Sequence, residues 1–373
     1  MKRRLLPVLL CQDYPLYTCA LGVSALGWLA LVSATRWTGA EAEPSRQGLF
    51  LFIGWTLAWL LGCLDYDWLR KLSLPAYLVC LGSLVAVMVP GIGQSAKGAQ
   101  RWIALGPLGA VQPSEFAKLV VVIVLAALLA WRSDQEGKPA ASLKTLILTF
   151  IAMGIPFVLI AAQPDLGTAL VLVAVCLVMV FVAGASPVVL GALIASGIAA
   201  LPHVLKEYQK DRLMIYRHPE HDPMGMGYSL VQSKTAIGSG GIFGKGLFAG
   251  HMTQHGFVPE NWTDFIFTVL GEELGLIGCL GFLALFAMLL ICTIRAAHLA
   301  HDLFGALLCT GVATLLAFQL VVNVAMTIGL APVVGLPLPL ASYGGSALLT
   351  NLCAVGVVAS VTATSRRRQT AEE

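Results

Sequence analysis

Long apolar segments, separated by short polar stretches, are the main pattern along this chain. Each segment is long enough to span, or nearly span, the hydrocarbon core of a bilayer, which takes roughly 20 residues of helix. A link of Ala-Gly-Ala-Ser separates the sixth segment from the seventh, so we expect a tight helical hairpin there. The pattern predicts ten membrane-spanning helices, approximately at 14–35, 48–64, 72–90, 114–131, 143–161, 166–183, 187–205, 264–294, 303–329 and 345–363.

The composition agrees with this pattern. Of the 373 residues, 58% are hydrophobic and 12% are charged, and the mean hydropathy is +0.83, whereas a soluble domain carries about 25% charged residues. We therefore predict an all-α polytopic membrane protein, in which residues 1–373 form a single integral membrane domain. Two segments are expected outside the helices. They are an interfacial segment at 91–113 and a long extracytoplasmic loop at 206–262, between the seventh and eighth helices.

Lysine and arginine residues predict the orientation, because cytoplasmic loops carry an excess of both. In the short connecting segments most of them fall on the side of the two termini, which includes the runs at 2–4 and 366–368. We expect both termini in the cytoplasm and the long loop outside. Residues 1–13 are interpreted as a cytoplasmic lead-in, because their apolar run is too short for a secretory signal. The net charge of +3 follows from the cytoplasmic anchors and gives no reason to expect a nucleic acid partner.

Residues 259–278 contain the most unusual acidic residues. Asp264 stands at the start of a long apolar segment, and Glu272 and Glu273 follow about two turns later. Carboxylates in a membrane-spanning segment are costly unless they face protein or water, so they are candidates for function. At 100° per residue, Asp264, Thr268 and Glu272 lie within roughly 80° of one another and predict a polar stripe along one helix. The alternative for Asp264 is a simple acid in the first helical turn.

Two shorter outward segments carry further polar residues. In 91–118, Gly and Pro predict an irregular interfacial segment that Trp102 anchors. Glu115 and Lys118 are spaced as i, i+3 partners, so they form either a local ion pair or two walls of a cavity beside Asp264. In 161–170, Asp165 follows Pro164 at the expected start of a helix, where an N-cap is the favoured interpretation.

The long loop at 206–262 shows no obvious secondary structure, and loops of this length are usually functional or disordered. Its aromatic and apolar residues argue against disorder. It contains Arg212, Lys234 and Lys245, together with Gly-Ser-Gly-Gly and Gly-Lys-Gly stretches that could either bring backbone amides to a phosphate or make turns. His218 with His221, and His251 with His255, have spacings that zinc sites use. No cysteine lies nearby, so we predict no metal site there. The nine cysteines of the chain lie in or beside apolar spans and are interpreted as free thiols.

Prolines and glycines interrupt the apolar pattern at 323–346. A broken backbone at membrane depth is tolerated where it is buried in protein or lines a cavity. This segment is therefore expected to form another wall of the same site.

Six segments of the chain resemble one family, the SEDS glycosyltransferases (shape, elongation, division and sporulation). The resemblance is strongest to the RodA branch of that family. Departures from the family pattern are Trp262 in place of the usual His, Ser229 in place of a common Gln, and Ala347 in place of a second Ser. The matching segments are GAQRWIALG (98–106), QPSEFAKL (112–119), QPDLGTAL (163–170), GYSLVQSKTAIGSGGIFGKG (227–246), PENWTDFIFTVLGEELGLIG (259–278) and MTIGLAPVVGLPLPLASYGGS (326–346).

The resemblance implies a SEDS fold with about ten transmembrane helices, in the cytoplasmic (inner) membrane, with the active site facing outward. It implies a peptidoglycan glycosyltransferase that polymerises lipid II into glycan strands for cell elongation and rod shape. It also implies partners: a class B penicillin-binding protein, which crosslinks the strands, and other proteins of the elongation complex.

Such a transfer inverts the anomeric centre of the donor in one displacement, so it needs a general base and positive charge for the departing undecaprenyl pyrophosphate. Asp264 is the predicted base, and a bound Mg²⁺ would share in holding the pyrophosphate. Glu115 is expected to pair with Lys118 and shape the donor groove, while Glu272, Ser342 and Tyr343 support the site. The residues expected to bind substrate or pyrophosphate are Arg101, Trp102, Glu115, Lys118, Arg212, Lys234 and Lys245.

Two other functions fit part of the pattern. A lipid II flippase would also need many spans and basic residues, but it would need polar lining on both sides of the membrane. A scaffold that only recruits the crosslinking enzyme gives no reason for Asp264 together with the basic residues. The unusual polar residues are concentrated on the outward half, which favours the polymerase.

Overall fold

Helices make up most of the chain, of which the computed structural model describes residues 11–36, 42–96, 99–104, 109–136, 142–204 and 207–372. Eight helices are long and apolar enough to cross a membrane, and α7 and α8 are shorter apolar helices. These ten helices confirm the predicted all-α polytopic fold. They are α2 (Tyr14–Thr35), α3 (Glu43–Cys63), α4 (Asp67–Met88), α5 (Pro113–Glu136), α6 (Leu143–Ala162), α7 (Leu166–Val182), α8 (Pro187–Val204), α12 (Ile266–Leu299), α13 (Leu303–Thr327) and α14 (Gly345–Glu372).

Acidic N-caps define where several of these helices begin. Asp13, Asp165 and Asp302 precede α2, α7 and α13, and each accepts a hydrogen bond from a backbone N–H of the first helical turn. Such a cap satisfies an N–H that has no partner within the helix. The N-cap interpretation of Asp165 is thereby confirmed. A tight turn joins α7 to α8, as the short link between them predicts.

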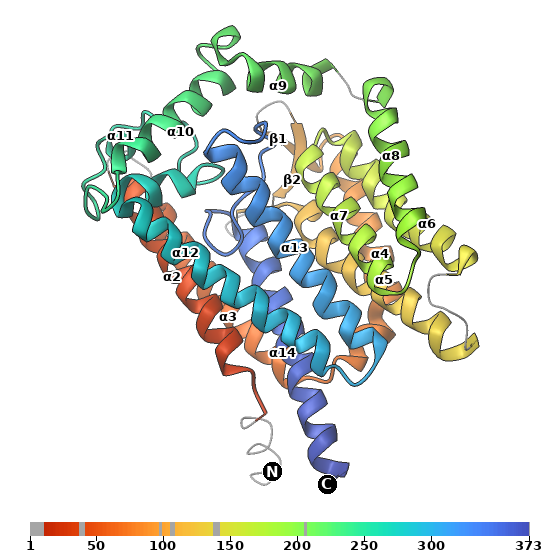
Figure 1. The fold of residues 1–373 in the computed structure, drawn as a ribbon. Coiled ribbons are helices and arrows are strands. Elements are labelled where there is room, and N and C mark those ends of the chain that lie inside the picture. The colour runs from red at the N-terminus through yellow and green to blue at the C-terminus, as the bar shows by residue number, and fades with distance from the viewer. Residues whose placement is uncertain are drawn as a thin grey trace.

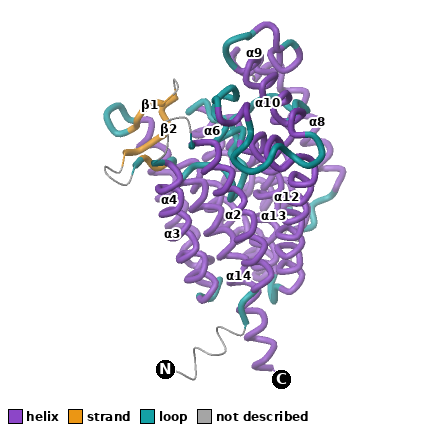
Figure 2. Tube along the Cα trace, turned by 90° about the vertical axis from the view of Figure 1, so that its left-hand side faces the viewer, coloured by secondary structure: helices purple, strands orange, loops and turns teal. Residues whose placement is uncertain are grey.

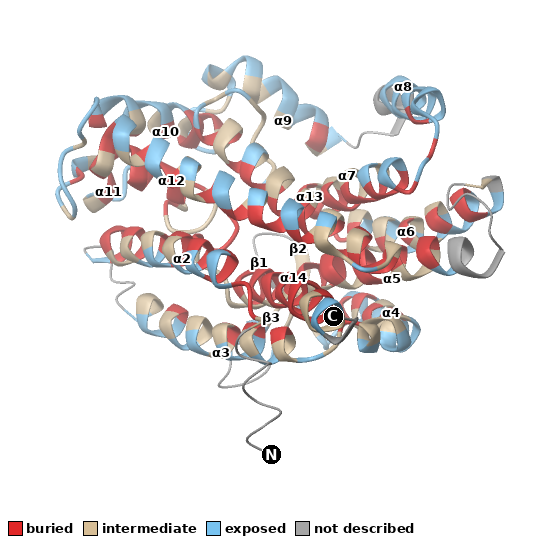
Figure 3. Cartoon of the chain, turned by 60° about the horizontal axis from the view of Figure 1, so that its bottom comes forward, coloured by how far each residue is buried: buried red, intermediate tan, exposed pale blue. Residues whose placement is uncertain are grey.

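The centre of the bundle is α14, which is buried along most of its length (Figure 3). Small residues let α3 approach it closely. A Cβ added at Gly54 would lie 2.5 Å from the side chain of Leu352, and one added at Gly356 would lie 2.7 Å from the backbone of Ala58. Close approach at small residues is a common way in which membrane helices pack, since lipid supplies little hydrophobic driving force. The start of α2 and the end of α14 lie at the same end of the bundle (Figure 1).

The long loop contains helices, so the expectation of a loop without secondary structure is wrong. It forms α9 (Glu207–Arg217), the short 3-10 helix η2 (Pro219–His221), α10 (Met226–Gly240) and α11 (His251–Gln254). These elements cover the end of the bundle opposite to the end of α14 (Figures 1 and 2). Here α10 packs directly on α12, because Gly240 allows its backbone to meet the carbonyl of Gly271.

The interfacial segment is also more regular than predicted. It contains a three-stranded antiparallel sheet of β1 (Gly93–Ala96), β2 (Ala99–Ala104) and β3 (Ala110–Val111), in the order β1-β2-β3. In its register Gln94 pairs with Trp102, and Ile103 pairs with Val111. The sheet lies at the same end of the bundle as α9 and α10 (Figure 2). The Gly and Pro content predicted an irregular segment. Pairing between the strands satisfies its backbone N–H and C=O groups.

The segment predicted as one helix at 264–294 differs from the structure in two respects. The helix α12 begins after Asp264, with Phe265 as its N-cap, and its backbone is broken at Gly275, where φ is 66°. Residues 241–246 pair with the broken turn. The amides of Lys245 and Gly246 donate to the carbonyls of Glu272 and Glu273 (both 3.0 Å), and the amides of residues 276 and 277 donate back to residues 241 and 242. The loop thus satisfies the backbone groups that the break releases.

Candidate active site

Asp264 lies in the turn that precedes α12 and is half-buried. Its backbone is held by α13, because Nδ2 of Asn323 donates to the carbonyl oxygen of Asp264 at 2.9 Å. The segment 262–263 is held by the loop before α14. Ser342 Oγ donates to the carbonyl of Thr263 at 2.5 Å, and the amide of Tyr343 donates to the carbonyl of Trp262 at 2.9 Å. The supporting role predicted for Ser342 and Tyr343 thus corresponds to positioning contacts.

Arg212 of α9 lies close enough to Asp264, Arg101 and Asp165 for their charges to act on it. Burial is the main cause that lowers the pKa of the Arg212 guanidinium in α9, and the positive charge of Arg101 adds to it. Tyr208 and the carboxylates of Asp264 and Asp165 raise that pKa. The Arg212 side chain of α9 therefore lies near β2, the start of α7 and the turn before α12. Arginine keeps its charge under these conditions because its intrinsic pKa is very high.

Both arginines are oriented by backbone carbonyls. Nη1 of Arg212 donates to the carbonyl of Val333 at 3.2 Å. Nε of Arg101 donates to the carbonyl of Gln163 at 2.8 Å, and its Nη2 donates to that of Pro164. Trp102, the neighbour of Arg101 on β2, is half-buried. The arrangement places two guanidinium groups beside carboxylates, on elements that are far apart in the sequence.

Gly335 closes another side of Asp264. Its φ is +75°, a left-handed conformation that favours glycine. A Cβ added at Gly335 would lie 3.5 Å from Oδ2 of Asp264. The non-helical stretch between α13 and α14 therefore runs beside the carboxylate, as the interruption of the apolar pattern predicts.

Glu115 and Lys118 form the predicted i, i+3 ion pair on α5. Nζ of Lys118 lies 2.7 Å from Oε2 of Glu115, and the side chains are 0% and 5% exposed. Both are therefore enclosed by the bundle, so the interpretation that they line an open cavity beside Asp264 is wrong. A fully buried lysine in a membrane protein requires such a counter-charge.

Glu272 and Glu273 also have structural roles. Glu272 is fully buried, and its Oε1 accepts from Nζ of Lys245 at 2.8 Å and from the amide of Met252 at 2.9 Å. Its Oε2 accepts from the amide and the hydroxyl of Thr253, both at 2.8 Å. Glu273 accepts a hydrogen bond from the hydroxyl of Ser33 in α2. The predicted polar stripe from Asp264 to Glu272 is therefore wrong, because Asp264 lies outside α12 and Glu272 holds the loop around α11.

The remaining basic candidates differ in their surroundings. Lys245 is engaged with Glu272, and the amides of Lys245 and Gly246 bond to α12, so this Gly-Lys-Gly stretch makes a packing turn and not a phosphate cradle. Lys234 is exposed on α10, has no ion-pair partner among the described residues, and its side chain lies over Gly329. Of the two, Lys234 is the one open to a ligand.

The residues that sequence reasoning missed are mainly positioning residues. Asn323 is fully buried in the apolar helix α13, and its Nδ2 also donates to the carbonyl of Leu336 at 2.7 Å. Tyr343 donates its hydroxyl to the carboxylate of Glu43, and Gln47 donates from Nε2 to the carbonyl of Ser342 at 3.1 Å. A polar residue within an apolar span was the available signal for Asn323.

The histidine pairs are stacked pairs of rings. The ring centroids of His218 and His221 lie 5.4 Å apart, and those of His251 and His255 lie 4.3 Å apart. Within the described ranges, no three His, Cys, Asp or Glu side chains are grouped as metal ligands. A metal at this surface would need ligands from a substrate or from water.

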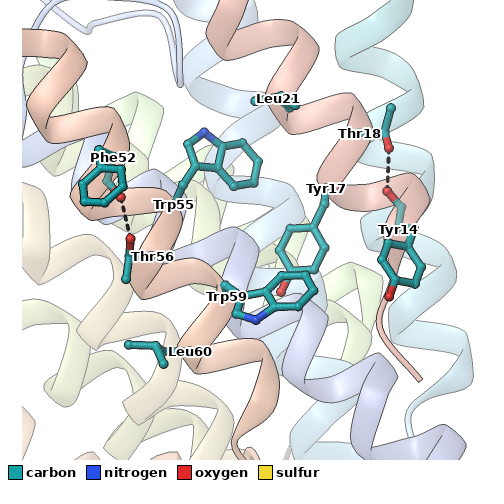
Figure 4. Close-up of a pocket in the computed structure, with 9 residues that line it drawn as sticks. All are labelled: Tyr14, Tyr17, Thr18, Leu21, Phe52, Trp55, Thr56, Trp59 and Leu60. Atoms are coloured by element: carbon teal, nitrogen blue, oxygen red, sulfur yellow. Dashed lines mark hydrogen bonds between the residues drawn. The ribbon is translucent and has the colours of Figure 1, made fainter. Parts of the chain in front are cut away.

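A groove of about 510 Å³ between α2 and α3 is lined by aromatic residues, which include Tyr14, Tyr17, Trp55 and Trp59 (Figure 4). Its Thr18 and Thr56 hydroxyls donate to carbonyls of their own helices. The groove contains no charged side chain and is formed near the start of α2, at the end of the bundle opposite to the start of α12. It lacks the charged groups that a general base or a pyrophosphate-binding site needs.

Comparisons with known proteins agree on one family. The model of the FtsW/RodA/SpoVE family, described as "Cell cycle protein", matches residues 14–367. The chain is 41% identical over 289 residues to the peptidoglycan glycosyltransferase MrdB of Escherichia coli (strain K12), covering 76% of each chain. It is 39% identical over 324 residues to the probable peptidoglycan glycosyltransferase FtsW of Trichlorobacter lovleyi, covering 85% of this chain and 83% of the relative.

A solved structure is similar over nearly the whole length. It is described as "Structural coordination of polymerization and crosslinking by a peptidoglycan synthase complex". The TM-score is 0.80 at 34% identity, and the match covers 96% of this chain and 98% of the other. The similarity therefore includes both the helical bundle and the end of the bundle that carries Asp264.

Proposed function

Because this chain belongs to the FtsW/RodA/SpoVE family of peptidoglycan glycosyltransferases, we propose that it polymerises lipid II into glycan strands at the outer face of the cytoplasmic membrane. The observation that carries the proposal is that the charges of Asp264 and Arg101 both act on the half-buried Arg212. A carboxylate beside two guanidinium groups supplies a base and an anion-binding surface within one site. Both substrates have lipid tails, which a protein embedded in the bilayer can receive laterally.

In the proposed reaction, the 4-hydroxyl oxygen of the acceptor sugar attacks the anomeric carbon of the donor. Asp264 accepts the hydroxyl proton as the new C–O bond forms. The bond from the anomeric carbon to the pyrophosphate oxygen breaks, and undecaprenyl pyrophosphate leaves with the electron pair. The single displacement inverts the anomeric centre. Asn323 and Ser342 contribute by holding the turn that carries the base.

Arg101, Arg212 and Lys234 are the proposed contacts of the pyrophosphate, with Trp102 beside Arg101. Arginine suits this role because its planar fork can bind phosphate oxygens in pairs. Lys118 and Lys245 are proposed to act through their acidic partners, Glu115 and Glu272, since both lysines are held in ion pairs.

A bound Mg²⁺ is also proposed. Magnesium is usually held by one or two carboxylates together with substrate phosphates, and Asp264 and Asp165 are the carboxylates near the two arginines. When bound, the ion would neutralise charge on the departing pyrophosphate. The residues present fit a site in which protein carboxylates and substrate phosphates together hold the ion. They do not form a site made of protein ligands alone.

We propose a role in cell elongation and rod shape, because HPEHDPMGMGY (218–228) and GSGGIFGKG (238–246) resemble the RodA branch of the family more than the FtsW branch. The proposed partners are a class B penicillin-binding protein and other elongation proteins. The similarity to a synthase that couples polymerization and crosslinking supports the first partner.

A groove of about 830 Å³ between α7, α8, α12 and α13 would accept a membrane helix, since its α13 wall carries the small residues Ala306, Thr310, Ala313 and Ala317. We also propose that both termini lie in the cytoplasm, because the basic runs at 2–4 and 366–368 favour that side.

The test is polymerisation of labelled lipid II by the purified protein in complex with a crosslinking partner whose own active site is inactivated. Wild type should make glycan ladders, and Asp264→Asn should lose about 10²–10⁴-fold in rate. Glu220→Gln, an exposed acid on the same face, is the matched control and should stay active. Ladders from Asp264→Asn at near wild-type rate would refute the base, and no ladders from a folded wild-type complex would favour a lipid II flippase.

A further inference from the structure

The aromatic groove between α2 and α3 opens on the surface of the bundle (Figure 4). Phe52 and Leu60, which line it, are 72% and 54% exposed, so the groove faces the surrounding lipid. Its aromatic wall is already packed, since the ring centroid of Tyr17 lies 5.5 Å from that of Trp59 and 6.1 Å from that of Trp55. In a bilayer the hollow is filled by hydrocarbon, which comes either from a lipid chain or from another helix.

The length of the groove favours a lipid chain. Its lining residues fall within 14–21 of α2 and 52–60 of α3, which is about 10 Å and about 12 Å of helix. Since the hydrocarbon core of a bilayer is about 30 Å thick, the groove stays within one leaflet. That leaflet is the one at the end of the bundle where α2 starts and α14 ends. By contrast, the groove beside α13 follows 306–321, or about 22 Å, which suits a helix that crosses both leaflets.

Hydrogen bonds connect the groove to the end of α14. Gln12 precedes the N-cap of α2. It accepts a hydrogen bond from the Tyr17 hydroxyl at 3.4 Å, and its Nε2 donates to the carbonyl of Gly62 in α3 at 3.1 Å. Nη1 of Arg366 donates to the carbonyl of Gln12 at 3.0 Å and to that of Cys11 at 3.4 Å. Gln12 thus joins both walls of the groove to Arg366.

Arg366 brings a positive charge to this end of the groove. Its side chain is partly exposed, both of these hydrogen bonds go to backbone carbonyls, and no acidic side chain of the described ranges forms an ion pair with it. The nearby carboxylate of Asp13 is paired with Arg295 at 2.6 Å, and Arg368 is paired with Asp67 at 2.7 Å. A guanidinium has five N–H donors, so Arg366 keeps donors besides Nη1 for an anion.

We propose that the groove binds an anionic phospholipid of this leaflet, with an acyl chain along the aromatic wall and the phosphate at Arg366. Arginine suits this role because its planar fork binds phosphate oxygens in pairs, and basic residues beside a membrane-spanning helix attract anionic lipids. Tyr and Trp are favoured where hydrocarbon meets the headgroups. The start of α12 lies at the opposite end of the bundle, so the lipid site is separate from the candidate active site.

The test is photo-crosslinking of the intact protein in phosphatidylcholine nanodiscs. The probe is phosphatidylglycerol or phosphatidylcholine with a diazirine on an acyl chain, and mass spectrometry locates the labelled peptides. We expect phosphatidylglycerol to label 14–21 and 52–60 about fivefold more than phosphatidylcholine does. The comparison surface is α4, where Leu78 and Val79 are 60% and 72% exposed and both probes should label equally. Neither substrate nor partner is needed, so the outcome is independent of the proposed function.

Arg366→Gln should lower the phosphatidylglycerol labelling of the groove about fivefold, the effect of one basic residue near an anionic lipid. Arg368→Gln is the matched control. It removes the same charge from the same helix, but two carboxylates already hold Arg368, so labelling should stay within about twofold. Thr56→Phe fills the groove and should lower labelling by both probes. Because it leaves the contacts of Arg366 intact, it tests the groove even where Arg366→Gln is unstable.

Equal labelling of the groove by the two probes would overturn the proposal and indicate that any bilayer lipid fills it. An equal loss in Arg366→Gln and Arg368→Gln would also overturn it, because the charge of the whole surface would then act in place of a contact at Arg366. Labelling of the groove no higher than that of α4, or unchanged in Thr56→Phe, would show that no lipid chain is bound there and would favour a partner helix.

Discussion

The side chain of Asn323 holds the backbone of Asp264 from a neighbouring helix. Its Nδ2 donates to the carbonyl oxygens of Asp264 at 2.9 Å and of Leu336 at 2.7 Å. One amide group therefore ties the turn that carries the proposed base to the loop that contains Gly335. The position of the carboxylate depends on this contact, because Asp264 lies outside the regular hydrogen bonding of α12.

Replacing Asn323 with leucine should lower kcat about 10- to 100-fold. The variant leaves two carbonyls without their donor, and a lost buried hydrogen bond costs about 1–3 kcal/mol, which corresponds to this range if it acts on the transition state. KM for lipid II should change less than kcat, because Asn323 is fully buried and does not reach a ligand. Steady-state polymerisation measures both constants.

Thr293→Val is the matched control for this variant. Thr293 is equally buried, lies on α12, and its hydroxyl donates to the carbonyl of Leu289 in its own helix. A kcat within twofold of wild type in Asn323→Leu would show that the hydrogen bond does not position the base.

Lys234 and Lys245 should respond differently to substitution with glutamine. Lys234 is exposed over Gly329, so Lys234→Gln should raise the KM for lipid II by removing a charge available to pyrophosphate. Lys245 is paired with the buried Glu272, so Lys245→Gln should lower Tm and leave KM within about threefold. Removing the ion-pair partner of a buried charge lowers the free energy of unfolding. The loss is smaller here because the Lys245 side chain is 31% exposed. An unchanged KM in Lys234→Gln together with a raised KM in Lys245→Gln would reverse these assignments.

A hydrogen bond at the opposite end of the bundle should affect stability alone. The hydroxyl of Tyr66 donates to Oδ1 of Asp302 at 2.7 Å, and its ring packs near Phe304. Tyr66→Phe keeps the ring and removes the hydroxyl, so it should cost about 1.5 kcal/mol, the lower value for a hydrogen bond to a charged group. Thermal unfolding should show a lower Tm while the polymerisation rate stays within twofold. A large fall in rate at unchanged Tm would indicate coupling between the two ends.

The proposed Mg²⁺ predicts that a chelator stops polymerisation and that added Mg²⁺ restores it. The ion would stabilise the charge on the departing pyrophosphate. Zn²⁺ is the control, because zinc favours nitrogen and sulfur ligands in a tetrahedral arrangement that the carboxylates near Asp264 do not provide. Polymerisation at an unchanged rate in chelator would remove the ion from the mechanism.

Much of the fold could be predicted from the sequence, because each local pattern has a local cause. Apolar runs of sufficient length predict helices in a membrane, and Asp165 at its helix start predicts an N-cap. The i, i+3 spacing of Glu115 and Lys118 predicts their ion pair. These features depend on neighbours within a turn or two of the same chain segment, so the linear order of residues was enough to determine them.

The partners of the charged groups were decided only by the tertiary structure. The periodicity placed Asp264 and Glu272 on one stripe, but the break at Gly275 and the pairing of residues 241–246 with α12 bind Glu272 to Lys245. Asn323 reaches Asp264 from 59 residues away in the sequence, and Arg212 approaches from α9. Such contacts form between segments distant in the chain, and no spacing within one segment encodes them. The sequence by itself therefore determined the helices and the candidate acid, and the packing of those helices decided which charges meet at the site.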